Sequence, residues 1–90
     1  AWQLQKVAGQ AVARAHDVIG KAGNVAGVKQ AELAKARELL RKAQWFWDIV
    51  AAENSMGFHN PDQVLNTLGQ SIDMAHQAAA TANKAANGAF

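Results

Sequence analysis

Apolar side chains recur at intervals of three and four residues along most of this 90-residue chain, and this spacing constrains its fold more than any other feature. A helix brings residues at such intervals onto one face, whereas a half-buried strand needs strict alternation, which the chain lacks. Gly20, Gly23, Gly27 and the segment Asn54–Pro61 interrupt the pattern, as residues at helix ends and turns do. The sequence therefore predicts an all-α protein.

We predict one three-helix bundle, spanning residues 1–90, with helices at about 2–22, 28–54 and 60–86 and with long second and third helices. Alanine supplies much of the apolar content, so we expect the bundle to need a partner, a cofactor or a parent domain for full stability. The tail beyond Ala78 is expected to fray unless it packs on another chain. The residues expected to face the core are Leu4, Val7, Ala11, Ala15, Val18 and Ile19, then Leu33, Ala36, Leu40, Ala43, Trp47 and Val50, and finally Leu65, Leu68, Ile72, Ala75, Ala79 and Ala82.

Composition excludes several functional classes. The net charge is only +2 and the cations are spread along the helices, so we expect no nucleic-acid partner. The chain contains no cysteine, which excludes disulfides, thiolate zinc sites and covalent haem attachment within it. No apolar run reaches the length of a membrane span, and no catalytic motif is present. The helical pattern already begins at Trp2, which suggests a mature product or a fragment of a longer chain.

His59 is the first candidate metal ligand. It precedes Asn60, the expected N-cap of the third helix, and Pro61, which suits the first helical position. The positive end of that helix favours the neutral imidazole, the form that binds metal. Phe58 and Trp47 could supply apolar walls beside a porphyrin. The alternative is a histidine with a purely structural role in a tight turn.

His16 and His76 are the second candidates for a metal site. In an up-down-up bundle the first and third helices are parallel, and both histidines fall within about a turn of one level. This arrangement would allow a bis-histidine site for non-covalent haem. The alternative is that both are surface histidines, because Asp17 follows His16 and Asp73 lies three residues before His76.

The two neighbouring tryptophans of the second helix cannot share one core. Trp45 and Trp47 are two residues apart, so their side chains point about 200° apart around the helix. We therefore expect one indole to face the bundle and the other to face a partner or cofactor.

Three segments of this region, Ala43–Asp48, Ala51–Ser55 and Phe58–Pro61, resemble the C-terminal helical region of multihaem c-type cytochromes. The similarity is to the cytochrome c nitrite reductases, especially the octahaem kind, and to the hydroxylamine oxidoreductase group. In that family a long helix with a Gln-x-x-Trp-Asp pattern leads into a turn containing His-x-Pro, and another long helix follows. The resemblance is most specific over residues 43–61 and extends from 28 to about 86.

The resemblance implies that His59 is the distal axial ligand of a c-type haem, whose cysteine attachments would lie on a haem-bearing polypeptide or parent domain. It also implies homo-oligomers that associate through the long helices, and a periplasmic or extracytoplasmic location. Those enzymes reduce nitrite to ammonia at a haem held by Cys-x-x-Cys-Lys or Cys-x-x-Cys-His. This chain lacks both motifs, and the family's catalytic residues lie upstream of this region. The chain alone is therefore not expected to be an enzyme.

Two other interpretations stay open on the sequence. The chain could be a stand-alone or engineered helical bundle that binds non-covalent haem through histidine. It could also be a structural interaction module without a cofactor.

Overall fold

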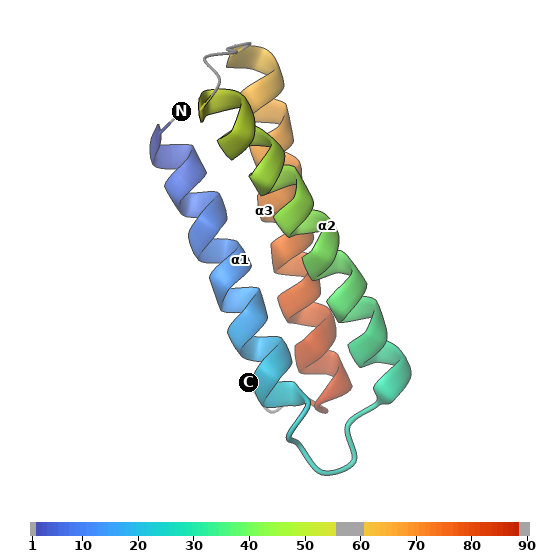
Figure 1. Cartoon of the computed structure of the whole chain (residues 1–90). Helices are drawn as coiled ribbons and strands as arrows, with labels where there is room; N and C mark the ends of the chain where they lie inside the picture. Colours follow the sequence, from blue (N-terminus) through green and yellow to red (C-terminus); the bar gives the residue numbers. More distant parts are fainter. Residues whose placement is uncertain (1, 56–60, 89–90) are drawn as a thin grey trace.

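Three helices make up the described part of the chain. The computed structural model describes residues 2–55 and 61–88, and within them α1 spans Trp2–Ala22, α2 spans Gln30–Ser55 and α3 spans Pro61–Ala85. Helices α1 and α3 run in the same direction and α2 runs oppositely (Figure 1). The predicted all-α, three-helix bundle with long second and third helices is confirmed.

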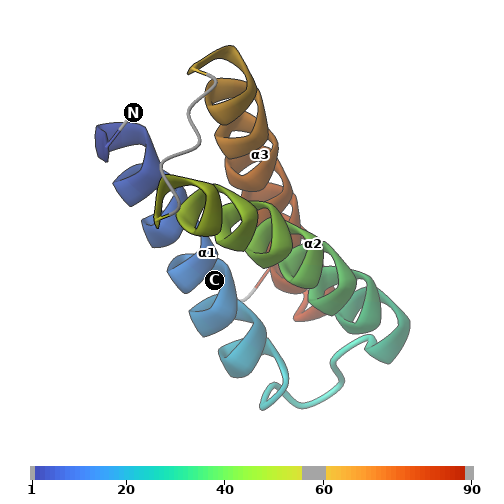
Figure 2. The same cartoon turned by 45° about the horizontal axis from the view of Figure 1, so that its top comes forward.

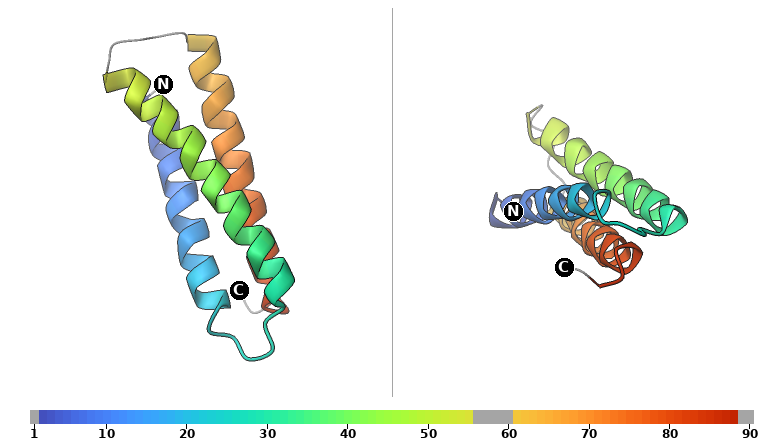
Figure 3. Two further views of the ribbon diagram at one scale, coloured as in Figure 1. Left: turned by 45° about the vertical axis from the view of Figure 1, so that its right-hand side comes forward. Right: turned by 90° about the horizontal axis from the view of Figure 1, so that it is seen from below.

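The bundle is long and narrow, with principal extents of 47 × 20 × 17 Å. Seen along its length, its helices are grouped around a common axis rather than laid in one flat layer (Figure 3). Helix α3 packs extensively on both α1 and α2, whereas α1 and α2 contact each other least. None of the helices in residues 2–55 and 61–88 combines the length and apolarity needed to cross a membrane.

The inward faces of all three helices follow one heptad rule. On each helix, one row of buried or half-buried positions alternates between spacings of three and four residues, which is the 3.5-residue period of coiled-coil packing. These positions are Leu4, Ala8, Ala11, Ala15, Val18 and Ala22 on α1, Leu33, Ala36, Leu40, Ala43, Trp47 and Val50 on α2, and Val64, Leu68, Ser71, Ala75, Ala78, Ala82 and Ala85 on α3.

Two of the predicted core positions are wrong. Val7 is 47% exposed and Leu65 is 51% exposed, and their neighbours Ala8 and Val64 are buried instead. Small side chains occupy many of the inward positions of α1 and α3. A prediction that follows the larger apolar residues therefore selects Val7 and Leu65, which lie next to the buried positions. On α2 the predicted face is confirmed, because there the large apolar residues and the heptad coincide.

Ser71 is the only buried polar side chain among the described residues. Its hydroxyl donates a hydrogen bond of 2.7 Å to the backbone carbonyl of Ala43. This contact brings the side chain of α3 directly onto the backbone of α2. Such close approach is available only because alanine and serine occupy the facing positions.

The end of α3 is ordered by backbone capping. Asn87 adopts a positive φ of 60°, and the N–H of Gly88 donates to the carbonyl of Asn83 at 2.8 Å while that of Asn87 donates to Lys84 at 3.1 Å. These two bonds form a Schellman motif. Ala82, Ala85 and Ala86 are also buried. The expectation of a frayed tail is therefore wrong for the described residues up to Gly88.

The connection between α1 and α2 closes the same end of the bundle (Figure 2). Gly27 has a φ of 77°, and this left-handed backbone turns the chain before α2 begins. The N–H of Lys29 donates to the carbonyl of Ala85 at 2.9 Å. Helix α2 starts at Gln30, two residues later than the sequence predicted, because Val28 still belongs to the connection, where its N–H donates to the carbonyl of Val25 at 3.3 Å.

Candidate functional site

The first predicted ligand, His59, and its neighbour Phe58 lie outside the described residues. The structure does describe the helices on either side of them in the sequence. Helix α2 ends at Ser55 and α3 begins at Pro61, and both of these helix ends lie at the end of the bundle where α1 starts (Figure 1). Asp62 lies in the first turn of α3, where its carboxylate interacts favourably with the partial positive charge of the helix N-terminus.

Trp47, the third predicted cofactor-binding residue, faces α1. Its indole N–H donates a hydrogen bond of 3.0 Å to the backbone carbonyl of Gln5. The ring lies against Gly9, where an added Cβ would come within 3.3 Å of Nε1. The glycine therefore allows α1 to approach the indole closely. Whether Trp47 also flanks a haem remains a prediction.

Trp45 faces away from the bundle, as expected for one of the two tryptophans. Its side chain is 59% exposed, and its ring packs edge-on against Phe46 with the centroids 5.2 Å apart and the planes at 63°. The two indoles thus have different environments, which confirms the prediction that they would not share a core.

An open groove runs along the contact between α1 and α2. It contains a cavity of about 450 Å³ beside Trp47, lined also by Gln5, Lys6, Gly9, Gln10 and Ala13. A second cavity of about 340 Å³ continues past Gln44 to His16. The groove exists because α1 and α2 contact each other least of the three helix pairs and because glycine and alanine line α1.

The two helical histidines lie in different grooves. His16 lines the α1–α2 groove, whereas His76 lines a cavity between α1 and α3. Both side chains are exposed. The structure therefore does not bring the predicted pair together in one pocket. Within residues 2–55 and 61–88, no three His, Cys, Asp or Glu side chains are grouped closely enough to hold a metal ion.

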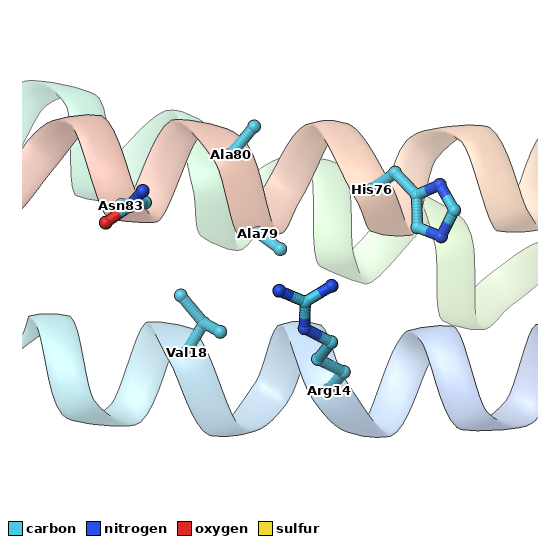
Figure 4. A pocket seen from close by; sticks show the side chains of 6 residues that line it. All are labelled: Arg14, Val18, His76, Ala79, Ala80 and Asn83. Atoms are coloured by element: carbon cyan, nitrogen blue, oxygen red, sulfur yellow. The ribbon is translucent and has the colours of Figure 1, made fainter. Parts of the chain in front are cut away.

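The cavity between α1 and α3 is lined by an arginine, Arg14, that was not predicted as a site residue from the sequence. Its volume is about 220 Å³, and its lining residues are Arg14, Val18, His76, Ala79, Ala80 and Asn83. Figure 4 shows the guanidinium of Arg14 extending from α1 toward α3, at a level between His76 and Asn83. The predicted parallel alignment of the two helices placed His16 near the level of His76, and the same alignment applied to Arg14 would have found this grouping.

Comparison with known proteins identifies relatives of this chain. The family model described as cytochrome c552 matches residues 1–89. The cytochrome c nitrite reductase subunit NrfA of Nitratidesulfovibrio vulgaris is 45% identical over 69 residues, which cover 72% of this chain and 13% of that protein. Cytochrome c-552 of Desulfotalea psychrophila is 41% identical over 71 residues, covering 79% of this chain and 14% of the relative.

A third relative extends the same pattern. Cytochrome c-552 of Aliarcobacter butzleri is 43% identical over 75 residues, covering 83% of this chain and 15% of that protein. The chain thus spans only 13–15% of the length of these relatives. No solved structure matches the chain. The resemblance to cytochrome c nitrite reductases is confirmed, and the chain belongs to the cytochrome c552 family.

Proposed function

We propose that this chain is the helical part of a larger multihaem cytochrome of the nitrite reductase type, and that His59 supplies an axial ligand to one of its haems. The family match over residues 1–89 carries the proposal. The relatives are several times longer than the chain, and the chain itself has no cysteine. Haem attachment would therefore lie on the remainder of the polypeptide, and this chain would contribute an imidazole and the helices on either side of it.

The arrangement of the histidines supports His59 over the helical pair. A haem held by His16 and His76 would have to reach two different grooves of a bundle whose interior is packed with alanine. If His59 alone binds a haem that is attached to another part of the protein, the haem does not have to reach either groove. Neutral imidazole is a common axial ligand of haem iron. The bound haem would supply the electron-transfer chemistry.

The test is His59→Ala in the complete haem protein. We expect one haem to change from low-spin six-coordinate to high-spin iron, as measured by electron paramagnetic resonance and visible absorption, with the number of attached haems unchanged. His16→Ala is the matched control, because it removes an exposed helical histidine and should leave the spectra unaltered. Spectra of His59→Ala identical to those of the unmodified protein would refute the ligand assignment.

The competing proposal of non-covalent haem binding has its own measurement. Haemin is titrated into the 90-residue chain and into His16→Ala, and the Soret band is recorded. We expect no saturable shift of the Soret band in either protein. A stoichiometric low-spin haem complex that is lost in His16→Ala would instead support the bis-histidine bundle.

We also propose that α2 provides a contact surface for a second subunit. The support is the exposed indole of Trp45, which packs edge-on against the ring of Phe46. Tryptophan is enriched at protein interfaces. In the complete protein, Trp45→Gln should shift the self-association equilibrium toward the monomer in sedimentation experiments. Val7→Gln, at an exposed apolar position of α1, is the control and should leave association unchanged. Equal association of Trp45→Gln and the unmodified protein would contradict this role.

The activity of the complete protein is part of the same proposal. Reduction of nitrite to ammonia and a periplasmic or extracytoplasmic location would follow from its kinship with nitrite reductase. We assign no catalytic residue to this chain. Nitrite-dependent oxidation of a reduced dye should be observed with the complete protein and not with the 90-residue chain. Activity in the isolated chain would contradict this division of roles.

A further inference from the structure

The cavity between α1 and α3 brings together nitrogen-bearing side chains from two helices. Arg14 comes from α1, and His76 and Asn83 come from α3. Between them lie Ala79 and Ala80, whose small side chains leave the space of about 220 Å³ open. In Figure 4 the guanidinium of Arg14 and the methyl group of Ala79 point toward one another across this space.

The positive charge of Arg14 is not neutralised within the described part of the chain. The ion pairs there join Lys21 to Asp17, Lys35 to Glu32 and Arg41 to Glu38. Asp17, three residues after Arg14, is therefore already bound to Lys21 at 3.0 Å. Asp73, one turn before His76, accepts a hydrogen bond of 2.8 Å from the amide of Gln77. Neither carboxylate forms an ion pair with Arg14 in the described part of the chain, so the cavity lining keeps this cation beside His76 and Asn83.

We propose that this cavity binds a carboxylate-type oxyanion, held by Arg14 and His76. The guanidinium presents N–H donors in a planar fork that matches the two oxygens of a carboxylate, and a ring N–H of His76 can add a third donor. A water molecule takes about 30 Å³ of liquid volume, so the cavity has room for a carboxylate and a short organic stem. This proposal does not depend on the role of His59.

Two sources could provide the carboxylate. It could be a free small carboxylate anion, or it could belong to the remainder of the larger protein, as an acidic side chain or a haem propionate. The shared chemistry is a planar group with one negative charge and two oxygens. The first experiment tests that chemistry and the second separates the sources.

The first experiment titrates the full 90-residue chain, labelled with ¹⁵N, with sodium acetate at constant ionic strength made up with sodium chloride. Saturable shifts are expected for the Arg14 Nε–H, the His76 ring and the backbone amide of Asn83. Arg14→Gln should weaken acetate binding by about tenfold or more, because a charge-assisted hydrogen-bond pair is lost. Arg41→Gln, at an exposed arginine already paired with Glu38, is the matched control and should bind as the unmodified chain does.

A second variant tests the cavity without removing the charge. Ala79→Leu fills the space in front of Arg14 and should abolish the saturable shifts, while circular dichroism verifies that the helices persist. Shifts that are linear in acetate, or equally large in Arg14→Gln, would overturn the proposal because they indicate only diffuse attraction to surface charge. Binding retained in Ala79→Leu would overturn it as well.

The second experiment uses the complete haem protein and thermal unfolding. If the ligand is a free anion, acetate should raise the Tm of the unmodified protein, as any ligand of the native state does, and should not raise the Tm of Arg14→Gln. If the carboxylate belongs to the protein, Arg14→Gln should lower the Tm whether or not acetate is present, and acetate should have no effect. A Tm that responds neither to acetate nor to Arg14→Gln would overturn the proposal for the complete protein.

Discussion

At the scale of single residues, glycine decides how closely α1 can approach the second helix. Gly9 faces the Trp47 indole, and a Cβ there would lie 3.3 Å from its Nε1. A Cβ at Gly69 on α3 would meet no atom within 4 Å beyond its chain neighbours and its own helical backbone. Both positions are helical. In an exposed helix interior alanine is more favourable than glycine by roughly 0.8–1 kcal/mol, so the two glycines should respond differently to the same substitution.

We predict that Gly69→Ala raises the free energy of unfolding by about 0.5–1 kcal/mol. Gly9→Ala should gain less or lose stability, because the new methyl group displaces the indole and weakens its hydrogen bond to Gln5. Urea unfolding of the two variants measures the difference. Equal stabilisation by both substitutions would mean that Gly9 is not needed for the contact with Trp47.

The tryptophans also show what can and cannot be predicted from the sequence for single residues. Their two-residue separation predicted one inward and one outward indole, which the structure confirms. It could not predict which one faces α1, because the contact depends on a glycine of another helix. The exposed pair His16 and His76 shows the same limit, since parallel helices fixed their level along the bundle but not the groove that each one lines.

At the scale of the helices, the sequence predicted their number and, to within about two residues, their described ends. It failed on parts of the inward faces of α1 and α3, where Val7 and Leu65 were expected to be buried. The reason is that alanine and serine occupy many of the inward positions of these helices. The size of the apolar side chains therefore does not indicate which face of the helix is buried. The seven-residue repeat of Val64, Ser71, Ala78 and Ala85 would have given the right one.

The cap of α3 provides the prediction at this scale. Asn87 is held at a φ of 60°, a conformation that costs a side-chain-bearing residue more than it costs glycine. We predict that Asn87→Gly raises the free energy of unfolding by a few tenths to about 1 kcal/mol, as measured by urea unfolding. Asn66→Gly, at an exposed position inside α3, is the control and should lower stability. A loss of stability in Asn87→Gly would show that the asparagine side chain contributes to the cap.

At the scale of the whole molecule, the core contains many residues, but most of their side chains are small. Ten of the 17 buried hydrophobic residues of the described chain are alanines, and each alanine removes little apolar area from water. Leu68, fully buried between α3 and its neighbours, is one of the few large side chains in that core. The stability of the bundle should therefore depend heavily on such residues.

We predict that Leu68→Ala costs about 2–5 kcal/mol, a large share of the stability of a domain of this size. Circular dichroism of the 90-residue chain at 25 °C should show a substantial loss of helix. Leu65→Ala removes the same side chain from a position that is 51% exposed, and it should leave the helical content nearly unchanged. Similar effects of the two substitutions would contradict the heptad phase of α3.

The place of α3 as the shared partner of the other two helices has a consequence for the timing of synthesis. Helices α1 and α2 contact each other least, and the backbone of Lys29 at the start of α2 is bound to Ala85 at the end of α3. At a translation rate of 5–20 residues per second, Ala85 is made roughly 3 to 11 s after Lys29. During that interval the nascent α1–α2 hairpin has neither its principal packing partner nor this bond, so it stays open to proteases and chaperones until α3 emerges.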